Sequence, residues 1–420
     1  MMGSIETAEL PLTTGQSQYF EMARGKSALC TVLWSCFRIP GELDIDRFTD
    51  SVETLVSRHE ALRIEIVERP GGEPRQRIRG LPPRTDLISC QNVIARSEEQ
   101  FNRYVRHIVV QELRQEWDAD AYPFRFRLFR YSPTVHALMV GLSHLAVDGI
   151  GAEILVRDLM RTYADIVAGR PPRGLPGRRF ADSLVRRSTM GGDTSRRSGE
   201  RNPEGLPLLT RFDVPPPDPG EPGGRSRPFS LALAGTELAA FREQVGLHGC
   251  TEFTWILAAF AWTVFRFTRQ DRIKISVPVN LRGPKEREVV GMYVLMVPVV
   301  IERPGDADGG RGFVAGVGSA VLRAMVRYRR CESWGVEFRT DLTVNHRKMS
   351  GLPSREFYQL GPTDYLPRVD YWTSGIDLRI FSYPDVLDVQ SVLDSRVFSE
   401  DGAKDVSETL RRYLTSGSSR

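Results

Sequence analysis

Few residues in this chain are of the types that build disulfide frameworks or metal centres. Cysteine occurs five times among 420 residues, at positions 30, 36, 90, 250 and 331. The number is odd and no two cysteines form a CxxC pair, so the sequence predicts reduced thiols. Histidine occurs six times, and no HExxH pattern or cysteine–histidine cluster supplies the donors that a metal ion needs. We therefore expect no metal site.

Long apolar segments are also missing. The longest runs, such as VVGMYVLMVPVVI, fall short of the roughly 20 residues that cross a membrane as a helix. The N-terminus, MMGSIETAELPLTT, has no basic stretch followed by an apolar one, so we expect a cytoplasmic protein without a secretory signal. The net charge of +4 is too small to predict nucleic-acid binding, which needs a concentrated basic face.

The sequence patterns of two common enzyme classes are absent, namely the GxSxG turn of serine hydrolases and the GxxxxGK[ST] phosphate-binding loop. What remains is one histidine at the end of an apolar run. In LMVGLSHLAVDGIGAEILVRDL, Asp148 and Gly149 follow His144 by four and five residues. Imidazole suits proton transfer near neutral pH, but a lone histidine is often a packing residue. The residues alone leave a general-base role and a structural role open.

A segment rich in Pro, Gly, Ser and Arg divides the chain. Residues 173–228 include DVPPPDPGEPGGRSRP, a composition that cannot bury much apolar surface. The sequence therefore predicts a linker between an N-terminal half, 1–172, and a C-terminal half, 229–420. The arginine pairs of this segment are typical of a solvated linker, and a docking surface for an acidic partner is the alternative.

Strand and helix patterns alternate in the first half. LPLTTGQSQYF predicts a helix capped by Thr13 or Thr14, CTVLWSCFRIPG a strand, and DIDRFTDSVETLVSRHEALR an amphipathic helix. VHALMVGLSH is apolar at both odd and even positions, which predicts a central strand covered on both faces. The helix that follows starts after Gly149 and ends at Gly169, with prolines beyond it.

The second half shows the same alternation. TELAAFREQVGLHG, TEFTWILAAFAWTVFRFT and FVAGVGSAVLRAMVRYRR predict helices. IKISVPVNLRG and VVGMYVLMVPVVIE predict strands, and two more strands are expected between residues 376 and 398. The alternation of strands and helices favours an α/β fold.

SHLAVDG resembles the HHxxxDG motif of condensation domains from nonribosomal peptide synthetases, which belong to the chloramphenicol-acetyltransferase-like superfamily. LPLTTGQSQYF, RHEALRIEIVE, YADIVAGRPP and VPVNLRGPKEREVVGMYVLMVPVVI are similar to further segments of that family and occur in its order, from residue 10 to about 300. Ser143 replaces the first histidine of the motif, and Leu295 stands where asparagine is common. The DFGWG motif of the plant-type branch is absent.

This resemblance implies two chloramphenicol-acetyltransferase-like lobes in a V-shaped pseudo-dimer, with the active-site tunnel between them. It implies that His144 accepts the proton of the attacking acceptor, and that Asp148 pairs with Arg282 to fix the loop that holds His144. Gly149 would either allow a close backbone approach or relieve a tight turn. Ser143 is expected to be dispensable, because it lies on the opposite strand parity from His144.

The implied activity is the transfer of an acyl group from a carrier-protein thioester to an amine or alcohol, by a standalone monomeric enzyme of natural-product biosynthesis. The expected partners are an acyl or peptidyl carrier protein and a small acceptor molecule. The phosphopantetheine arm of the carrier would be part of the substrate, and no bound cofactor is implied. Two alternatives stay open: a coenzyme-A-dependent O-acyltransferase of the same fold, and a catalytically silent condensation-like module that recruits a partner.

Overall fold

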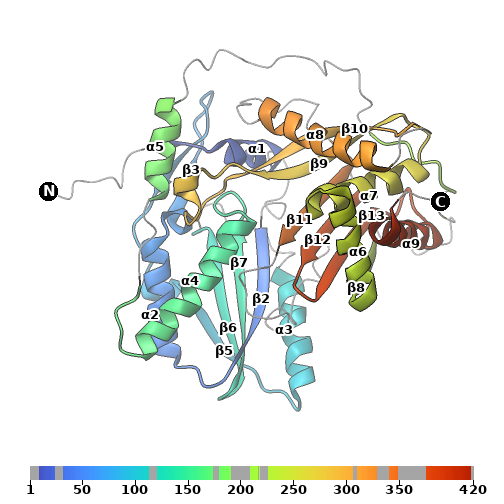
Figure 1. Ribbon diagram of the computed structural model, residues 1–420. Helices are drawn as coiled ribbons and strands as arrows, with labels where there is room; N and C mark the ends of the chain where they lie inside the picture. Colours follow the sequence, from blue (N-terminus) through green and yellow to red (C-terminus); the bar gives the residue numbers. More distant parts are fainter. Residues whose placement is uncertain are drawn as a thin grey trace. The chain divides into compact units, whose positions relative to one another are not determined.

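The computed structural model contains two compact units (Figure 1). It describes residues 9–23, 32–112, 121–173, 179–190, 209–215, 217, 226–305, 310–328, 340–348 and 375–417. The described residues up to 190 form the first unit together with Asn280–Val294, and the other described residues from 209 onward form the second. Asn280–Val294 thus lies in the second half of the sequence but belongs to the first unit.

The first unit is built on a four-stranded sheet and a smaller three-stranded one. The larger sheet has the order β2 (Val32–Pro40), β7 (Val135–Ser143), β6 (Phe124–Ser132), β5 (Ser89–Asn92). Its first three strands are antiparallel, and β5 runs parallel to β6. The smaller sheet has the order β1 (Leu10–Pro11), β4 (Arg75–Ile78), β3 (Ile64–Val67).

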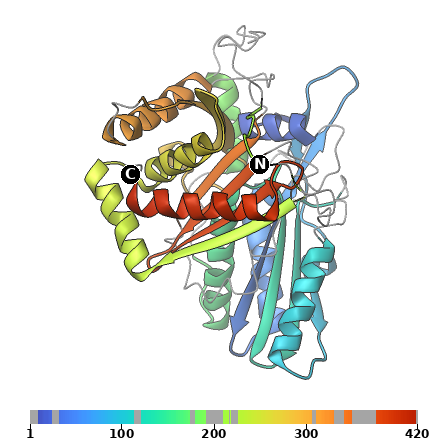
Figure 2. The ribbon, with the colours of Figure 1, turned by 90° about the vertical axis from the view of Figure 1, so that its right-hand side faces the viewer.

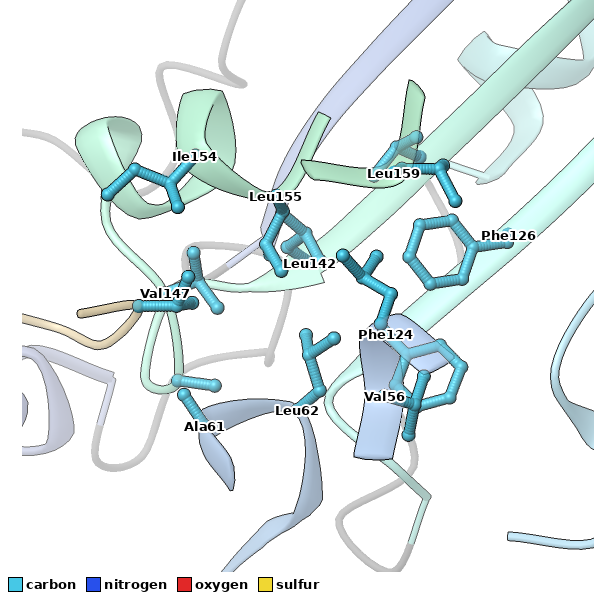
Figure 3. Close-up of a cluster of buried hydrophobic side chains, with 14 of the residues drawn as sticks. Val56, Ala61, Leu62, Phe124, Phe126, Leu142, Val147, Ile154, Leu155 and Leu159 are labelled. Atoms are coloured by element: carbon cyan, nitrogen blue, oxygen red, sulfur yellow. The ribbon is translucent and has the colours of Figure 1, made fainter. Parts of the chain in front are cut away.

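Strand β7 is covered on both faces, as its sequence predicts. Leu142 and the other even-numbered apolar residues of β7 pack under α2 (Ile45–Arg58) and α4 (Gly149–Val167), which Figure 3 shows around Leu142. Met139 and Ala137 pack on the opposite face with residues of α3 (Glu98–Glu112). Each fully buried leucine, valine or methionine side chain contributes about 1.5–3 kcal/mol to stability. The residue that follows β7 is therefore attached to a well-packed strand.

Helix α2 ends before the sequence pattern does. The pattern predicts a helix through Arg63, but α2 stops at Arg58 and a 3₁₀ turn covers Glu60–Arg63. His59 breaks the helix with an extended backbone (φ −100°, ψ 94°), and both His59 and Glu60 are buried. The Glu60 carboxylate accepts a hydrogen bond from the Ala181 N–H at 2.9 Å. Tertiary contacts therefore override the local helical pattern at this point.

The segment expected to be a linker contributes folded parts to both units. Helix α5 (Phe180–Met190) lies within it, and Phe180 is buried in the core of the first unit. Farther along, the Phe212 ring packs against Phe398 of the second unit at a centroid distance of 4.7 Å. Residues 191–208 and most of 216–225 lie outside the described residues. The structured regions thus extend into the range 173–228, because a few apolar residues dock where the overall composition is that of a linker.

The second unit contains a six-stranded sheet and four of the described helices. The sheet has the order β10 (Val294–Glu302), β9 (Arg272–Asn280), β11 (Leu342–Lys348), β12 (Ile376–Ser382), β13 (Val386–Asp394), β8 (Ser226–Ala234). The helices are α6 (Gly235–His248), α7 (Glu252–Arg266), α8 (Gly310–Tyr328) and α9 (Glu400–Ser416). Helix α7 is buried from Trp255 to Phe265, and α9 lies beside α6 and β8 (Figure 2). Across the described part of the chain, no helix has an apolar stretch long enough to span a membrane.

The two units repeat one arrangement of strands. The order β2-β7-β6-β5 in the first corresponds to β8-β13-β12-β11 in the second. In each unit the second strand of this series leads through a short turn into a helix, α4 or α9. The N-cap residue, Asp148 or Ser399, accepts a hydrogen bond from the backbone N–H three residues later, at 2.8 and 3.0 Å respectively. The first residue after the strand is His144 in the first unit and Ser395 in the second.

The strand predicted over residues 289–302 is shorter in the structure. It begins at Val294, as β10, whereas Val289, Val290 and Tyr293 are buried in the core of the first unit. The apolar run is therefore divided between a loop that packs in one unit and a strand that pairs in the other. Burial explains its composition throughout, but only its second part is extended in a sheet.

Candidate active site

His144 lies immediately beyond β7, in the turn that leads to α4. The turn is closed by hydrogen bonds from the backbone N–H groups of Ala146 and Val147 to the Ser143 carbonyl, at 2.9 and 3.0 Å. The His144 side chain is half-buried. Because His144 belongs to the turn, strand alternation does not fix the direction of its side chain relative to that of Ser143. The parity argument for a dispensable Ser143 therefore does not hold, and its dispensability stays a prediction.

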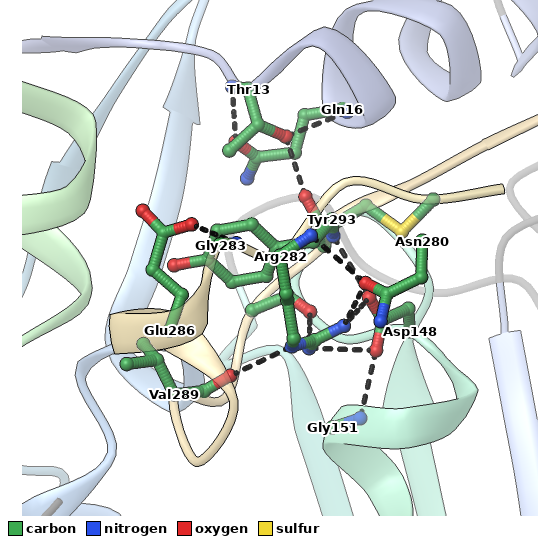
Figure 4. A network of polar contacts seen from close by, with 12 residues as sticks. Thr13, Gln16, Asp148, Gly151, Asn280, Arg282, Gly283, Glu286, Val289 and Tyr293 are labelled. Carbon is green, nitrogen blue, oxygen red and sulfur yellow. Dashed lines mark hydrogen bonds and ion pairs between the residues drawn. The ribbon is translucent and has the colours of Figure 1, made fainter. Parts of the chain in front are cut away.

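Asp148 ends this turn and is surrounded by hydrogen-bond donors (Figure 4). One carboxylate oxygen accepts from the Gly151 N–H at 2.8 Å and from Arg282 Nη2 at 2.9 Å. The other accepts from Arg282 Nη1 at 2.6 Å and from the Tyr293 N–H at 2.9 Å. The Asp148 side chain is fully buried. The ion pair expected between Asp148 and Arg282 is thus present, in the two-pronged geometry that makes arginine–carboxylate pairs strong.

Arg282 is nearly as buried as Asp148, with 2% of its side chain exposed. Its remaining donors are used within its own loop, because Nη2 donates to the Gly291 carbonyl at 3.1 Å and Nε to the Val289 carbonyl at 3.3 Å. The guanidinium carbon lies 4.5 Å from the centre of the Tyr293 ring. A buried ion pair repays its desolvation only when such additional hydrogen bonds satisfy both partners, and here they do.

Residues 281–293 form a loop, hereafter the clamp loop, that is fastened to the first unit at several points. The Asp148 N–H donates to the Gly291 carbonyl at 3.2 Å. The Thr13 hydroxyl donates to the Met292 carbonyl at 2.7 Å (Figure 4). The loop closes on itself through the Leu281 N–H and the Tyr293 carbonyl, 2.8 Å apart. The start of α4 and the clamp loop are therefore held as one assembly.

Gly291 lets the clamp loop approach α5. A Cβ atom placed on Gly291 would lie 2.6 Å from Phe180 Cε2 and 2.6 Å from Tyr293 Cε2. The Phe180 and Tyr293 rings meet edge to face, with their centroids 6.0 Å apart. The glycine in VVGMY is thus required by packing on both sides, and no residue larger than glycine fits without displacing an aromatic ring.

We expect Gly291→Ala to lower the free energy of unfolding of the first unit by about 1–3 kcal/mol, the usual cost of forcing an extra group into a packed core. Chemical denaturation followed by tryptophan fluorescence and circular dichroism would measure the change. Gly80→Ala is the matched control, because a Cβ on Gly80 has no neighbour within 4 Å. Equal unfolding midpoints for the two variants would show that the clamp loop is not packed as described.

Gly151, two residues after Gly149, lies too close to its neighbours for a side chain. A Cβ on Gly151 would lie 2.9 Å from Val147 Cγ1 and 3.3 Å from the Asp148 carboxylate. Gly149 is the first residue of α4, and its own role stays a prediction. The sequence has no specific signal for Gly151, because any residue except proline offers the backbone N–H that reaches the capping aspartate.

Two residues of α1 (Thr14–Ala23) contact the turn that carries His144, and the sequence gives no separate indication of either. Gln16 is fully buried, and its side-chain amide donates to the Leu145 carbonyl at 2.9 Å. The Tyr19 hydroxyl lies 3.3 Å from His144 Nε2. Thr13 accepts a hydrogen bond from the Gln16 N–H at 3.0 Å, which confirms it as the cap of this helix. The segment LPLTTGQSQYF thus folds against the candidate catalytic residue.

Other groups considered in the sequence are not assigned to this site, or lie outside the described residues. Leu295 is fully buried in β10 and belongs to the second unit. Cys36 is buried, and burial raises the pKa of its thiol to about 12, which makes it unreactive. Cys30 and Cys331 lie outside the described residues. Within the described ranges, no three His, Cys, Asp or Glu side chains are grouped so that they could hold a metal ion.

Comparison with known proteins places these features in a family. Residues 6–327 match the family model of the condensation domain. The chain belongs to the condensation-domain family. Over 269 residues this condensation domain is 25% identical to tyrocidine synthase 3 of Brevibacillus parabrevis, a match that covers 61% of this chain and 4% of the synthase. The chain therefore spans only a small part of the length of that relative.

Solved structures agree on the fold. This condensation domain is similar to the X-domain from teicoplanin biosynthesis, with a TM-score of 0.73 at 19% identity over 100% of this chain and 98% of the other. It is also similar to the protein in the structure on condensation domain-mediated chain release from the enacyloxin polyketide synthase, with a TM-score of 0.72 at 17% identity over 100% and 86% of the chains. The predicted α/β fold of two chloramphenicol-acetyltransferase-like lobes is confirmed.

Proposed function

We propose that this condensation domain transfers an acyl group from a carrier-protein thioester to an amine or alcohol, with His144 as the general base. The observation that supports the proposal is the fixed position of His144. Its turn lies at the end of a buried strand, and the buried pair of Asp148 and Arg282 holds the start of the following helix. Members of this family generally form amide or ester bonds.

In the proposed reaction the acceptor nitrogen or oxygen attacks the thioester carbonyl carbon while its proton passes to the His144 imidazole. The new C–N or C–O bond forms, the C–S bond breaks, and the departing pantetheine thiolate takes up the proton. Asp148 has a supporting role, because its two oxygens already accept four hydrogen bonds. It fixes the turn, and the reactivity lies in the imidazole.

The proposed donor is a carrier-protein thioester whose phosphopantetheine arm is part of the substrate, and no resident cofactor is invoked. A coenzyme A thioester is the alternative donor. A second candidate function is recruitment of a partner protein without catalysis. It is supported by the similarity to the X-domain, which has also been solved as a complex with OxyB.

The proposal is tested by incubating the chain with one acyl group presented in three ways: on a carrier protein, on coenzyme A and on pantetheine. Panels of amines and alcohols serve as acceptors, and products are detected by mass spectrometry. His144→Ala gives the background rate. Product from the carrier-bound donor supports the proposal, and product from coenzyme A without preference for the carrier supports the alternative donor. The absence of product from all three donors would favour the recruitment function.

The carrier hypothesis predicts a salt dependence. Carrier proteins are commonly acidic near the pantetheine attachment site, and this chain has a net charge of +4. Attraction between exposed charges weakens as salt rises, because the Debye length is about 8 Å at physiological ionic strength and shorter above it. We therefore expect kcat/KM for the carrier-bound donor to fall with added salt, while the pantetheine donor changes little. The same salt response for both donors would contradict steering of a carrier by charge.

A further inference from the structure

Two glutamine side chains join the turn that carries His144 to the smaller sheet of the first unit. Gln16 lies in the first turn of α1, and Gln76 lies in β4, the central strand of that sheet. Both are fully buried. The Gln16 amide nitrogen donates to the Gln76 side-chain oxygen at 2.9 Å, and the Gln76 amide nitrogen donates to the Gln16 side-chain oxygen at 2.8 Å. The two side chains, hereafter the amide pair, are thus bonded to each other in both directions.

Three backbone groups fix the direction of the amide pair. The Thr13 N–H donates to the Gln16 side-chain oxygen at 2.8 Å (Figure 4). The Gln16 amide nitrogen donates to the Leu145 carbonyl at 2.9 Å. The Gln76 amide nitrogen donates to the Pro11 carbonyl at 2.8 Å. A backbone N–H can only donate and a carbonyl can only accept, so an amide turned over in place would bring like groups together. The arrangement therefore has one consistent direction.

The Leu145 carbonyl is the point at which the amide pair holds the turn. The turn is closed on itself at Ser143 and fixed to the clamp loop at Asp148. Leu145 lies between these two points and is bonded directly to His144, so its position affects the backbone from which the imidazole projects. Movement of the turn away from α1 would leave a donor of Gln16 buried without a partner, which is unfavourable.

The amide pair is itself anchored on two sides. Gln76 is paired within its sheet to Leu10 of β1 and to Ile66 of β3. Helix α1 lies against the end of the clamp loop with no space between them, because a Cβ on Gly15 would lie only 2.3 Å from the Val294 carbonyl oxygen. The Gln16 amide is therefore presented to the turn from a packed base.

We propose that Gln16 and Gln76 are positioning residues for the reaction at His144. Gln16 sets the turn by holding the Leu145 carbonyl, and Gln76 acts through Gln16 by holding its amide in place. Both act through the backbone of the turn. Such an effect can be large, because misplacement of a catalytic group by about 1 Å can cost roughly 10²-fold in rate. The effect on the reaction rests on the proposed function, whereas the effect on the turn does not.

Hydrogen exchange of the full chain, followed by mass spectrometry, tests the hold on the turn. In the wild type, two N–H groups of the turn are bonded to the Ser143 carbonyl. Gln16→Met removes the amide at a similar side-chain length. We expect residues 144–148 to exchange about threefold to tenfold faster in this variant, the effect of losing one buried hydrogen bond. Gln100→Met is the matched control, because Gln100 is exposed and accepts from the Arg96 N–H at 2.7 Å.

Gln76→Met tests the action of Gln76 through Gln16, and it replaces Gln16→Met should that variant fail to fold. The increase in exchange should be smaller, because Gln16 keeps its bonds to Thr13 and Leu145. The double variant should exchange at the rate of Gln16→Met alone. Unchanged exchange in Gln16→Met, or in Gln76→Met if only that variant folds, would overturn the proposal. Additive increases would overturn the action of Gln76 through Gln16.

Kinetics test the effect on the reaction. With the donor that gives wild-type turnover, kcat of Gln16→Met should fall about 10- to 100-fold while the KM of the donor is unchanged. Asp165→Asn is the control for lost stability, because Asp165 is fully buried and bonded to Arg173 near the far end of α4. It should lower the unfolding midpoint and keep the kcat of the folded protein. Faster exchange with an unchanged kcat would overturn the role in the reaction. If no donor supports turnover, the proposed function fails, and hydrogen exchange still decides whether the amide pair holds the turn.

Discussion

Replacement of His144 by alanine is expected to reduce acyl transfer by about 10²- to 10⁴-fold, the usual contribution of a general base. Stability should change little, because the side chain is half-buried and the turn keeps its backbone hydrogen bonds to Ser143. The measurement is initial rate by mass spectrometry with the donor that gives wild-type turnover. Thermal unfolding followed by circular dichroism would show that the fold is retained.

Ser143→Ala is the matched control for this variant, since it removes a polar side chain one residue away. It should keep most of the activity. Wild-type turnover in His144→Ala would rule out His144 as the base. A loss in Ser143→Ala as deep as that in His144→Ala would assign Ser143 a part in the chemistry.

The second large effect concerns stability. Arg282→Ala is expected to lower the free energy of unfolding by about 3–5 kcal/mol, because it leaves a buried carboxylate without its counter-charge. Asp148 would then retain only the N–H groups of Gly151 and Tyr293 as partners. Denaturant unfolding of wild type and variant would measure the difference. Activity should fall as well, since the turn that carries His144 loses its anchor.

Glu288→Ala is the control for charge removal in the same loop. Glu288 is 61% exposed, and it pairs with Arg157 of α4, so it also joins the clamp loop to α4, but at the surface. Such pairs contribute about 0–1 kcal/mol. The double variant Asp148→Ala/Arg282→Ala should lose less stability than the sum of the two single variants, because no charge is left buried alone. Strict additivity would contradict the buried pair.

The strand, turn and helix around His144 could be predicted from the sequence because each depends on neighbouring residues. Apolar residues at both parities indicate a strand covered on two faces. Asp148 caps the next helix locally, and Gly169 ends it with a left-handed backbone (φ 66°). The partner Arg282 is 134 residues away, and only the family resemblance pointed to it.

The remainder of the site depends on contacts that leave no local pattern. Apolar residues of the clamp loop indicate burial, but not in which unit they are buried. Nothing in the sequence distinguishes Gln16 and Tyr19 from other residues of the predicted helix. Gln16 contacts Leu145, 129 residues away, and Tyr19 contacts His144, 125 residues away. Helix α5 docks through a few apolar residues within a segment of linker-like composition. Such features follow from tertiary packing alone.

The clamp loop limits where two members of this family can be joined to make a chimaera. By sequence it connects β9 to β10, two strands of the second unit, yet Asn280–Val294 belongs to the first. A crossover placed at the apparent linker would combine the Asp148 of one parent with the Arg282 of another, together with its surrounding aromatic residues. Recombination that transfers residues 280–294 along with the first half would keep both members of the ion pair from the same parent. The residues of the site therefore come from two separate segments of the gene.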